Sequence, residues 1–157
     1  MSYLTPPAYD VAAGSIVGSQ VGTMAATKER FHMITAYQML GRLAALLILL
    51  QAGTIGYSSF AHGDATASRI HEITGMMVLP VVVLAMLIVA FLAKSSVSIR
   101  FGVVLVLLLI IQIGLGSMGP KMHWLGALHG VIALVLFGAA AMAAVMAGRE
   151  QPKSATS

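Results

Sequence analysis

Four long apolar runs follow one another along the chain, and short polar connections separate them. The runs lie near residues 35–58, 69–93, 100–118 and 124–147. Each run is long enough to cross the hydrocarbon core of a membrane as a helix, which takes about 20 residues. The runs lack the alternation of apolar and polar positions that marks the strands of a membrane barrel. The pattern therefore predicts an all-α integral membrane protein.

The connections between the runs are short, so consecutive helices should pack as antiparallel neighbours in a four-helix bundle. We expect the bundle to occupy residues 33–148, with tails at residues 1–32 and 149–157. The N-terminal tail is rich in Gly, Ala, Ser and Thr, and we expect it to be disordered on its own or to lie on a partner. Pro80 falls inside the second run and should kink that helix.

The distribution of basic residues predicts the orientation of the bundle. Loops on the cytoplasmic side of a membrane carry an excess of Lys and Arg. The first 30 residues also contain no apolar segment typical of a signal peptide. We therefore expect a multi-pass protein of a bacterial-type cytoplasmic (inner) membrane, with both termini in the cytoplasm. The basic residues of the expected inner side are Lys28, Arg30, Lys94, Arg100, Arg149 and Lys153, and those of the outer side are Arg69 and Lys121.

Composition agrees with a membrane protein and excludes several other classes. Of the 157 residues, 59% are hydrophobic and only 9% are charged, whereas soluble domains have roughly a quarter charged residues. The absence of cysteine excludes disulfides, thiolate metal ligands and c-type haem attachment. The net charge of +4 comes from scattered residues, so no nucleic-acid partner is expected. The expected partners are the lipid bilayer and a larger membrane complex.

Two segments of the chain resemble each other. Each starts with Gln-x-Gly, continues through small residues and a turn, and reaches a histidine at the start of the next apolar run. We interpret them as duplicated helical hairpins related by a pseudo-two-fold axis along the membrane normal. This axis would place the two histidines at equal depth. The corresponding positions are Gln51, Gly53, Gly56 and His71 in one copy and Gln112, Gly114, Gly116 and His129 in the other.

His71 and His129 are candidate metal ligands, since ionisable residues in membrane spans are costly and commonly functional. The positions three and four residues from each histidine are mostly small, which leaves clearance on these helix faces. A flat macrocycle with one imidazole on each side needs such clearance, so the pattern favours a bis-histidine haem b site. The glutamines would orient the imidazoles and Arg69 would face the propionates. The expected cofactor-binding residues are Gly53, Gly56, Gly75, Gly114, Gly116, Gly126, Gln51, Gln112 and Arg69, and the expected metal ligands are His71 and His129.

Two other interpretations of the histidines stay open. In the first, His62, His71, His123 and His129 bind copper together with Met118 and Met122, because methionine and imidazole suit copper. In the second, the histidines bind no cofactor, and the chain is a structural subunit of a respiratory or photosynthetic membrane complex.

The segments around the histidines resemble one four-helix half of the haem A synthase family. "RIHEITG" and "GALHGVIALVLF" look like the second- and fourth-helix segments of that family, and "LLIIQIGLG" looks like its third-helix Gln-Leu-Gly stretch. The resemblance covers roughly residues 40–145, is shared with small four-helix membrane haem b proteins, and implies His71 and His129 as the haem pair. The family joins two such halves, however, and its acidic loop residue has only Asp64 as a loose counterpart here.

These observations together predict a cytochrome b-like membrane protein. We expect it to transfer single electrons, or to carry haem as an accessory subunit of a larger complex, rather than to act as a stand-alone enzyme. One haem near one face does not carry electrons across the membrane alone. A quinone or a redox partner is therefore implied.

Overall fold

The computed structural model describes the backbone of residues 9–61, 64–119 and 121–150, and side chains from Met24 onward. These residues are almost entirely helical and include no strand. Four helical segments are long and apolar enough to cross a membrane. The predicted all-α membrane bundle is thus confirmed. In chain order the elements are α1 (Tyr9–Phe60), α2 (Ala65–Ile73), the π-helix η1 (Thr74–Val78), α3 (Leu79–Leu92), α4 (Ser96–Met118) and α5 (His123–Arg149).

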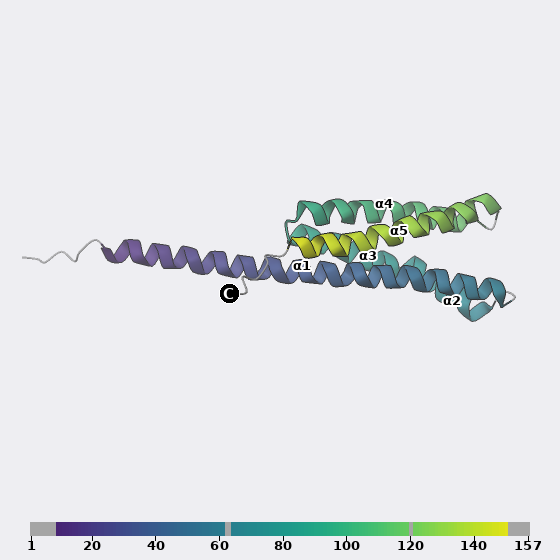
Figure 1. The fold of residues 1–157 in the computed structure, drawn as a ribbon, viewed down its shortest axis with the longest axis horizontal. Helices are drawn as coiled ribbons and strands as arrows, with labels where there is room; N and C mark the ends of the chain where they lie inside the picture. Colours follow the sequence, from purple (N-terminus) through teal and green to yellow (C-terminus); the bar gives the residue numbers. More distant parts are fainter. Residues whose placement is uncertain (1–8, 62–63, 120, 151–157) are drawn as a thin grey trace, which may run out of the picture.

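The four spans pack in a ring, with α1 between α3 and α5, and α4 between the same two helices (Figure 1). The second span and α5 are therefore diagonal to each other, as the duplicated-hairpin interpretation requires. The buried core includes Tyr37, Met86, Leu105 and Leu136 together with many alanines. Small residues at the helix contacts let the backbones approach closely, as is common in membranes. Large apolar side chains cover the outside, where lipid would contact them.

The two hairpins separate toward the end of the bundle that carries the histidines. α2 packs on α1 and on η1, and it makes no comparably extensive contact with α4 or α5. At the opposite end the spans are held together by polar contacts. The buried Tyr37 hydroxyl donates to the Ser98 carbonyl at 3.0 Å. Ser95 donates from its hydroxyl to Glu150 at 2.6 Å, which joins the start of α4 to the end of α5.

The second span is interrupted just before Pro80. The N–H of Leu79 donates to the carbonyl of Thr74, five residues earlier, and this is the π-helical pattern of η1. Pro80 follows at the start of α3 and has no N–H of its own to donate. The irregularity expected at the proline therefore takes the form of a π-helix on its N-terminal side. Single π-helical turns occur frequently at functional sites.

The first helix is much longer than its membrane span. It begins at Tyr9, and its first part projects beyond the other helices in Figure 1. At ~1.5 Å per residue, its 52 residues extend about 78 Å. The expected disorder of the N-terminal tail is therefore wrong from Tyr9 onward, and residues 1–8 lie outside the described residues. Adding residues to an existing helix avoids the cost of nucleation, which explains why a tail of modest propensity continues the span.

The last helix, α5, ends at Arg149, and residues 151–157 lie outside the described part of the chain. The positions of Lys94, Arg100 and Arg149 place the basic loops at the end of the bundle remote from the histidines.

Candidate cofactor site between the two hairpins

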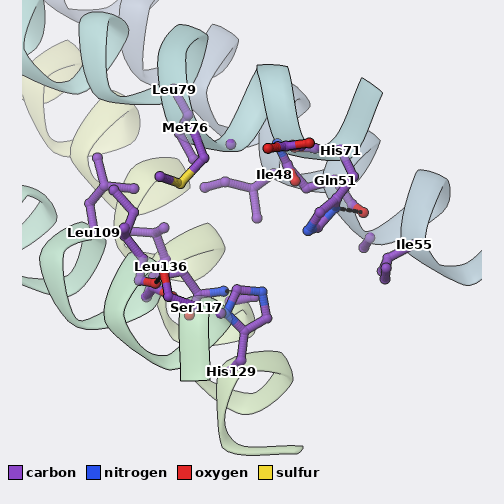
Figure 2. Close-up of a pocket in the computed structure, with 17 residues that line it drawn as sticks. Ile48, Gln51, Ile55, His71, Met76, Leu79, Leu109, Ser117, His129 and Leu136 are labelled. Atoms are coloured by element: carbon purple, nitrogen blue, oxygen red, sulfur yellow. Dashed lines mark hydrogen bonds between the residues drawn. The ribbon is translucent and has the colours of Figure 1, made fainter. Parts of the chain in front are cut away.

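A cavity of about 480 Å³ lies where the two hairpins separate, and all four spans contribute to its wall (Figure 2). Its volume falls within the roughly 300–1,000 Å³ typical of small-molecule and cofactor sites. Apolar side chains form most of the wall, and a few polar groups converge on it. The apolar residues include Ile48, Ile55, Leu79, Leu109 and Leu136, and the polar ones are Gln51, His71, Glu72, Gln112, Ser117 and His129.

His71 enters the cavity from α2 with its ring nitrogens in distinct roles. Its Nδ1 lies 3.1 Å from the carbonyl oxygen of Gln51 on α1. A backbone carbonyl only accepts hydrogen bonds, so Nδ1 carries the proton and donates. No described residue hydrogen-bonds to Nε2, which holds the lone pair in the neutral form of the ring. A neutral imidazole fixed through Nδ1 in this way is the form that ligates metals.

His129 repeats this arrangement in the second hairpin. Its Nδ1 lies 3.0 Å from the carbonyl oxygen of Gln112 on α4, so Nδ1 again carries a proton and the neutral form of the ring has its lone pair at Nε2. The side-chain amide of Gln112 lies 3.2 Å from that Nε2 and donates to it. One contact therefore occurs in both copies of the proposed repeat: the histidine Nδ1 donates to the backbone carbonyl of the glutamine in its own hairpin.

The two imidazoles approach each other across the cavity. Their ring centroids lie 6.3 Å apart, and the ring planes cross at 63°. Both histidines are half-buried. The sequence predicted that these residues would meet at equal depth, and the structure brings them together from diagonal helices.

The side chains of the two glutamines differ. The Gln51 amide turns away from His71 Nε2 and donates to the His71 carbonyl at 3.0 Å and to the Thr74 hydroxyl at 2.6 Å. A Cβ on Gly75 would lie 3.0 Å from the Gln51 amide nitrogen, so glycine leaves the space that this amide occupies. In the second hairpin, Gln112 is only 8% exposed. Its Oε1 has no hydrogen-bond partner among the described residues.

The expected cofactor-binding glycines fall into two groups. Gly75 and Gly116 line the cavity, and a Cβ on Gly116 would lie 3.0 Å from Cε1 of His129. The others do not line the cavity. No described atom lies within 4 Å of a Cβ built on Gly53, Gly56 or Gly114, and Gly126 packs against the backbone of Gly119.

Arg69, the expected partner for propionates, lies beside the cavity rather than in its wall. It lines a second hollow, formed by residues of α2 and η1, together with Ser68, Glu72 and Met76. Glu72 and Met76 also line the cavity, so the two hollows share an edge. Thr74 is not part of the cavity wall, but its hydroxyl accepts from the Gln51 amide at 2.6 Å.

The structure gives no support to a multi-histidine copper site. Within the described ranges there is no group of three or more His, Cys, Asp or Glu side chains that would hold a metal ion. Met118 is exposed at the end of α4, and Met122 and His123 are exposed at the start of α5. His62 lies outside the described residues. The described histidines that line the cavity are His71 and His129.

Comparison with protein families, curated proteins and solved structures found no match. The function of the cavity is therefore argued from its geometry.

Proposed function

We propose that this chain binds one haem b between its two hairpins through His71 and His129. In this role it transfers single electrons or carries haem as an accessory subunit of a larger membrane complex. The observation that carries the proposal is the facing pair of imidazoles, each oriented by the glutamine carbonyl of its own hairpin.

The separation of the imidazoles supports a shared ion. Two imidazoles that bind one metal ion from opposite sides through Nε2, with bonds of ~2 Å, have ring centroids roughly 6 to 6.5 Å apart. The centroids here lie 6.3 Å apart. Both rings also hold the proton on Nδ1, which leaves the two Nε2 atoms as the ligating positions.

The cavity also suits a large apolar group. Its walls are mostly aliphatic, and Gly75 and Gly116 keep the backbone close to the glutamine and histidine side chains. One local change is required, since the Gln112 amide must leave Nε2 of His129 before that nitrogen binds a metal. When bound, haem supplies one-electron chemistry. The protein fixes the imidazole orientation and tautomer, and shields the site from water.

The same proposal includes the orientation of the chain and its need for a partner. The basic loops lie at the end remote from the cavity, and by the positive-inside tendency this supports a cavity near the outer face of a cytoplasmic membrane with both termini inside. A haem near one face needs a quinone or a redox protein to supply or accept electrons.

The resemblance to half of the haem A synthase family fits haem binding but not synthase activity. Asp64, the loose counterpart of the acidic loop residue in that family, caps α2 here. Its carboxylate accepts from the N–H of Ala67 at 2.8 Å. That contact gives Asp64 a structural role at a helix N-terminus.

The test is spectroscopic. We would purify the chain in mild detergent from haem-replete cells and record oxidised and dithionite-reduced spectra. We expect sharp low-spin α and β bands in the wild type, and the loss of these bands in His71→Ala and in His129→Ala. His123→Ala, at the exposed start of α5, is the matched control and should keep them. A colourless wild type would refute the proposal.

A cofactor-free structural subunit is the second candidate, and the projecting part of α1 favours it. A helix that extends beyond the bundle into the aqueous phase presents a surface for other subunits. The two functions separate in one purification: a structural subunit copurifies with a complex and is colourless when separated from it.

A further inference from the structure

We propose that the two histidines play unequal roles: His71 is the fixed ligand, and His129 is the exchangeable ligand because the Gln112 amide competes with the metal for its Nε2. A small diatomic molecule would then bind opposite His71. This inference rests on the proposed haem site, and it names the ligand class that the same site would admit.

The contacts around His71 hold this residue in one position. Its ring donates to the Gln51 carbonyl, and its own carbonyl accepts from the Gln51 amide at 3.0 Å. The same amide donates to Thr74 at 2.6 Å, which ties α1 to the start of η1. Gln51 therefore secures His71 through both ring and backbone, and Nε2 stays without a competing partner among the described residues.

The contacts around His129 place a competitor on the ligating atom itself. The Gln112 amide donates to Nε2 at 3.2 Å, and the Gln112 carbonyl accepts from Nδ1 at 3.0 Å. Both ring nitrogens are thus satisfied by one residue of α4. The ring also rests against Gly116, where a Cβ would be 3.0 Å from Cε1. Without a metal, both ring nitrogens of His129 therefore have a hydrogen-bond partner, whereas Nε2 of His71 has none among the described residues.

Gln112 also supplies what a bound diatomic molecule needs. Its side chain is almost fully buried at the cavity wall. Because its Oε1 has no partner among the described residues, the hydrogen bond to His129 is the one contact that orients the amide there. A hydrogen-bond donor above the vacated coordination position is one of the features that decide whether haem binds diatomic ligands. The Gln112 amide is such a donor, and Gln51 is not, because its amide is committed to α2.

The first part of the experiment compares the two histidine variants. Reduced protein is titrated with carbon monoxide while the Soret band is recorded. We expect His71→Ala to lose haem. His129→Ala should keep haem in a high-spin form, with an apparent affinity for carbon monoxide raised roughly tenfold or more because no internal ligand competes. Equal loss of haem from both variants would overturn the inference while leaving haem binding itself established.

The second part tests Gln112. Gln112→Leu removes the amide without adding an iron ligand, so His129 stays on the iron and the affinity for carbon monoxide should fall roughly fivefold, the worth of about one hydrogen bond. Gln112→Glu, which removes the donor but keeps the shape, should act in the same direction and serves if the first variant fails to fold. Unchanged affinity in a folded, coloured variant would refute the role of Gln112. A colourless wild type would instead refute the proposed function.

Discussion

Gly116 allows a sharp test of the site, because a single methyl group there acts directly on a proposed ligand. In Gly116→Ala the new Cβ would lie 3.0 Å from Cε1 and 3.2 Å from Nδ1 of His129. Ordinary van der Waals contact begins near 3.4 Å, so the ring must move by about 0.4 Å or tilt. The hydrogen bond from Nδ1 to the Gln112 carbonyl, now 3.0 Å long, is then stretched or lost.

The expected size of this effect follows from that hydrogen bond. Losing one typical intramolecular hydrogen bond costs about 1 kcal/mol, which corresponds to roughly a fivefold loss of haem affinity. Gly114→Ala is the matched control, because it lies two residues away on α4 and no described atom is within 4 Å of its Cβ. Alanine is favoured over glycine inside a helix by about 1 kcal/mol, so the control should bind haem normally and unfold no more easily than the wild type.

The assay is haem titration of the haem-free chain, with thermal unfolding of both variants as the check on folding. We expect weaker haem binding in Gly116→Ala only, with a reduced spectrum shifted from the wild type. Equal haem affinity in the two variants would refute the reasoning, since the ring would then not depend on the space above Gly116.

Three further results are expected. Gly75→Ala should displace the Gln51 amide, whose nitrogen lies 3.0 Å from the new Cβ, and should weaken haem binding in the same titration by roughly the worth of one hydrogen bond, about fivefold. Asp64→Ala should lower the free energy of unfolding by about 1 kcal/mol through loss of the helix cap, measured by denaturation in detergent, and leave the haem spectrum unchanged; a changed spectrum would contradict a purely structural role. Tyr37→Phe removes the donor to the Ser98 carbonyl and should cost about 1 kcal/mol of stability without altering the spectrum, whereas no loss would show that this contact is not stabilising.

Hydropathy was enough to predict the spans, because a run of about 20 apolar residues has few alternatives to a membrane helix. The pairing of His71 with His129 was also predictable, since the repeat places both at the same depth. The role of the glutamines was only partly foreseen. Spacing brought Gln51 and Gln112 near the histidines, but it did not reveal that the backbone carbonyls accept from Nδ1 while the amides point in different directions.

The glycines show where sequence spacing was insufficient. On α4 the cavity is lined by Leu109, Gln112, Ile113, Gly116 and Ser117, which are related by three- and four-residue steps and define one helix face. Gly114 lies off that face, although it is close to Gln112 in sequence. A Gln-x-Gly motif suggests proximity, but the helical period decides which glycine borders the ligand.

The π-helix η1 changes the rotational phase of the second span. Leu79 follows His71 by eight residues. On α5, Leu136 follows His129 by seven residues, and both leucines line the cavity. In an undisturbed α-helix one additional residue turns the following side chains by about 100°. The wide turn at Thr74–Val78 absorbs that residue, so Leu79 and His71 face the same cavity. The span is thereby divided into a part that carries His71 and a part that packs in the core, and the π-helical turn sets the rotation between the two parts.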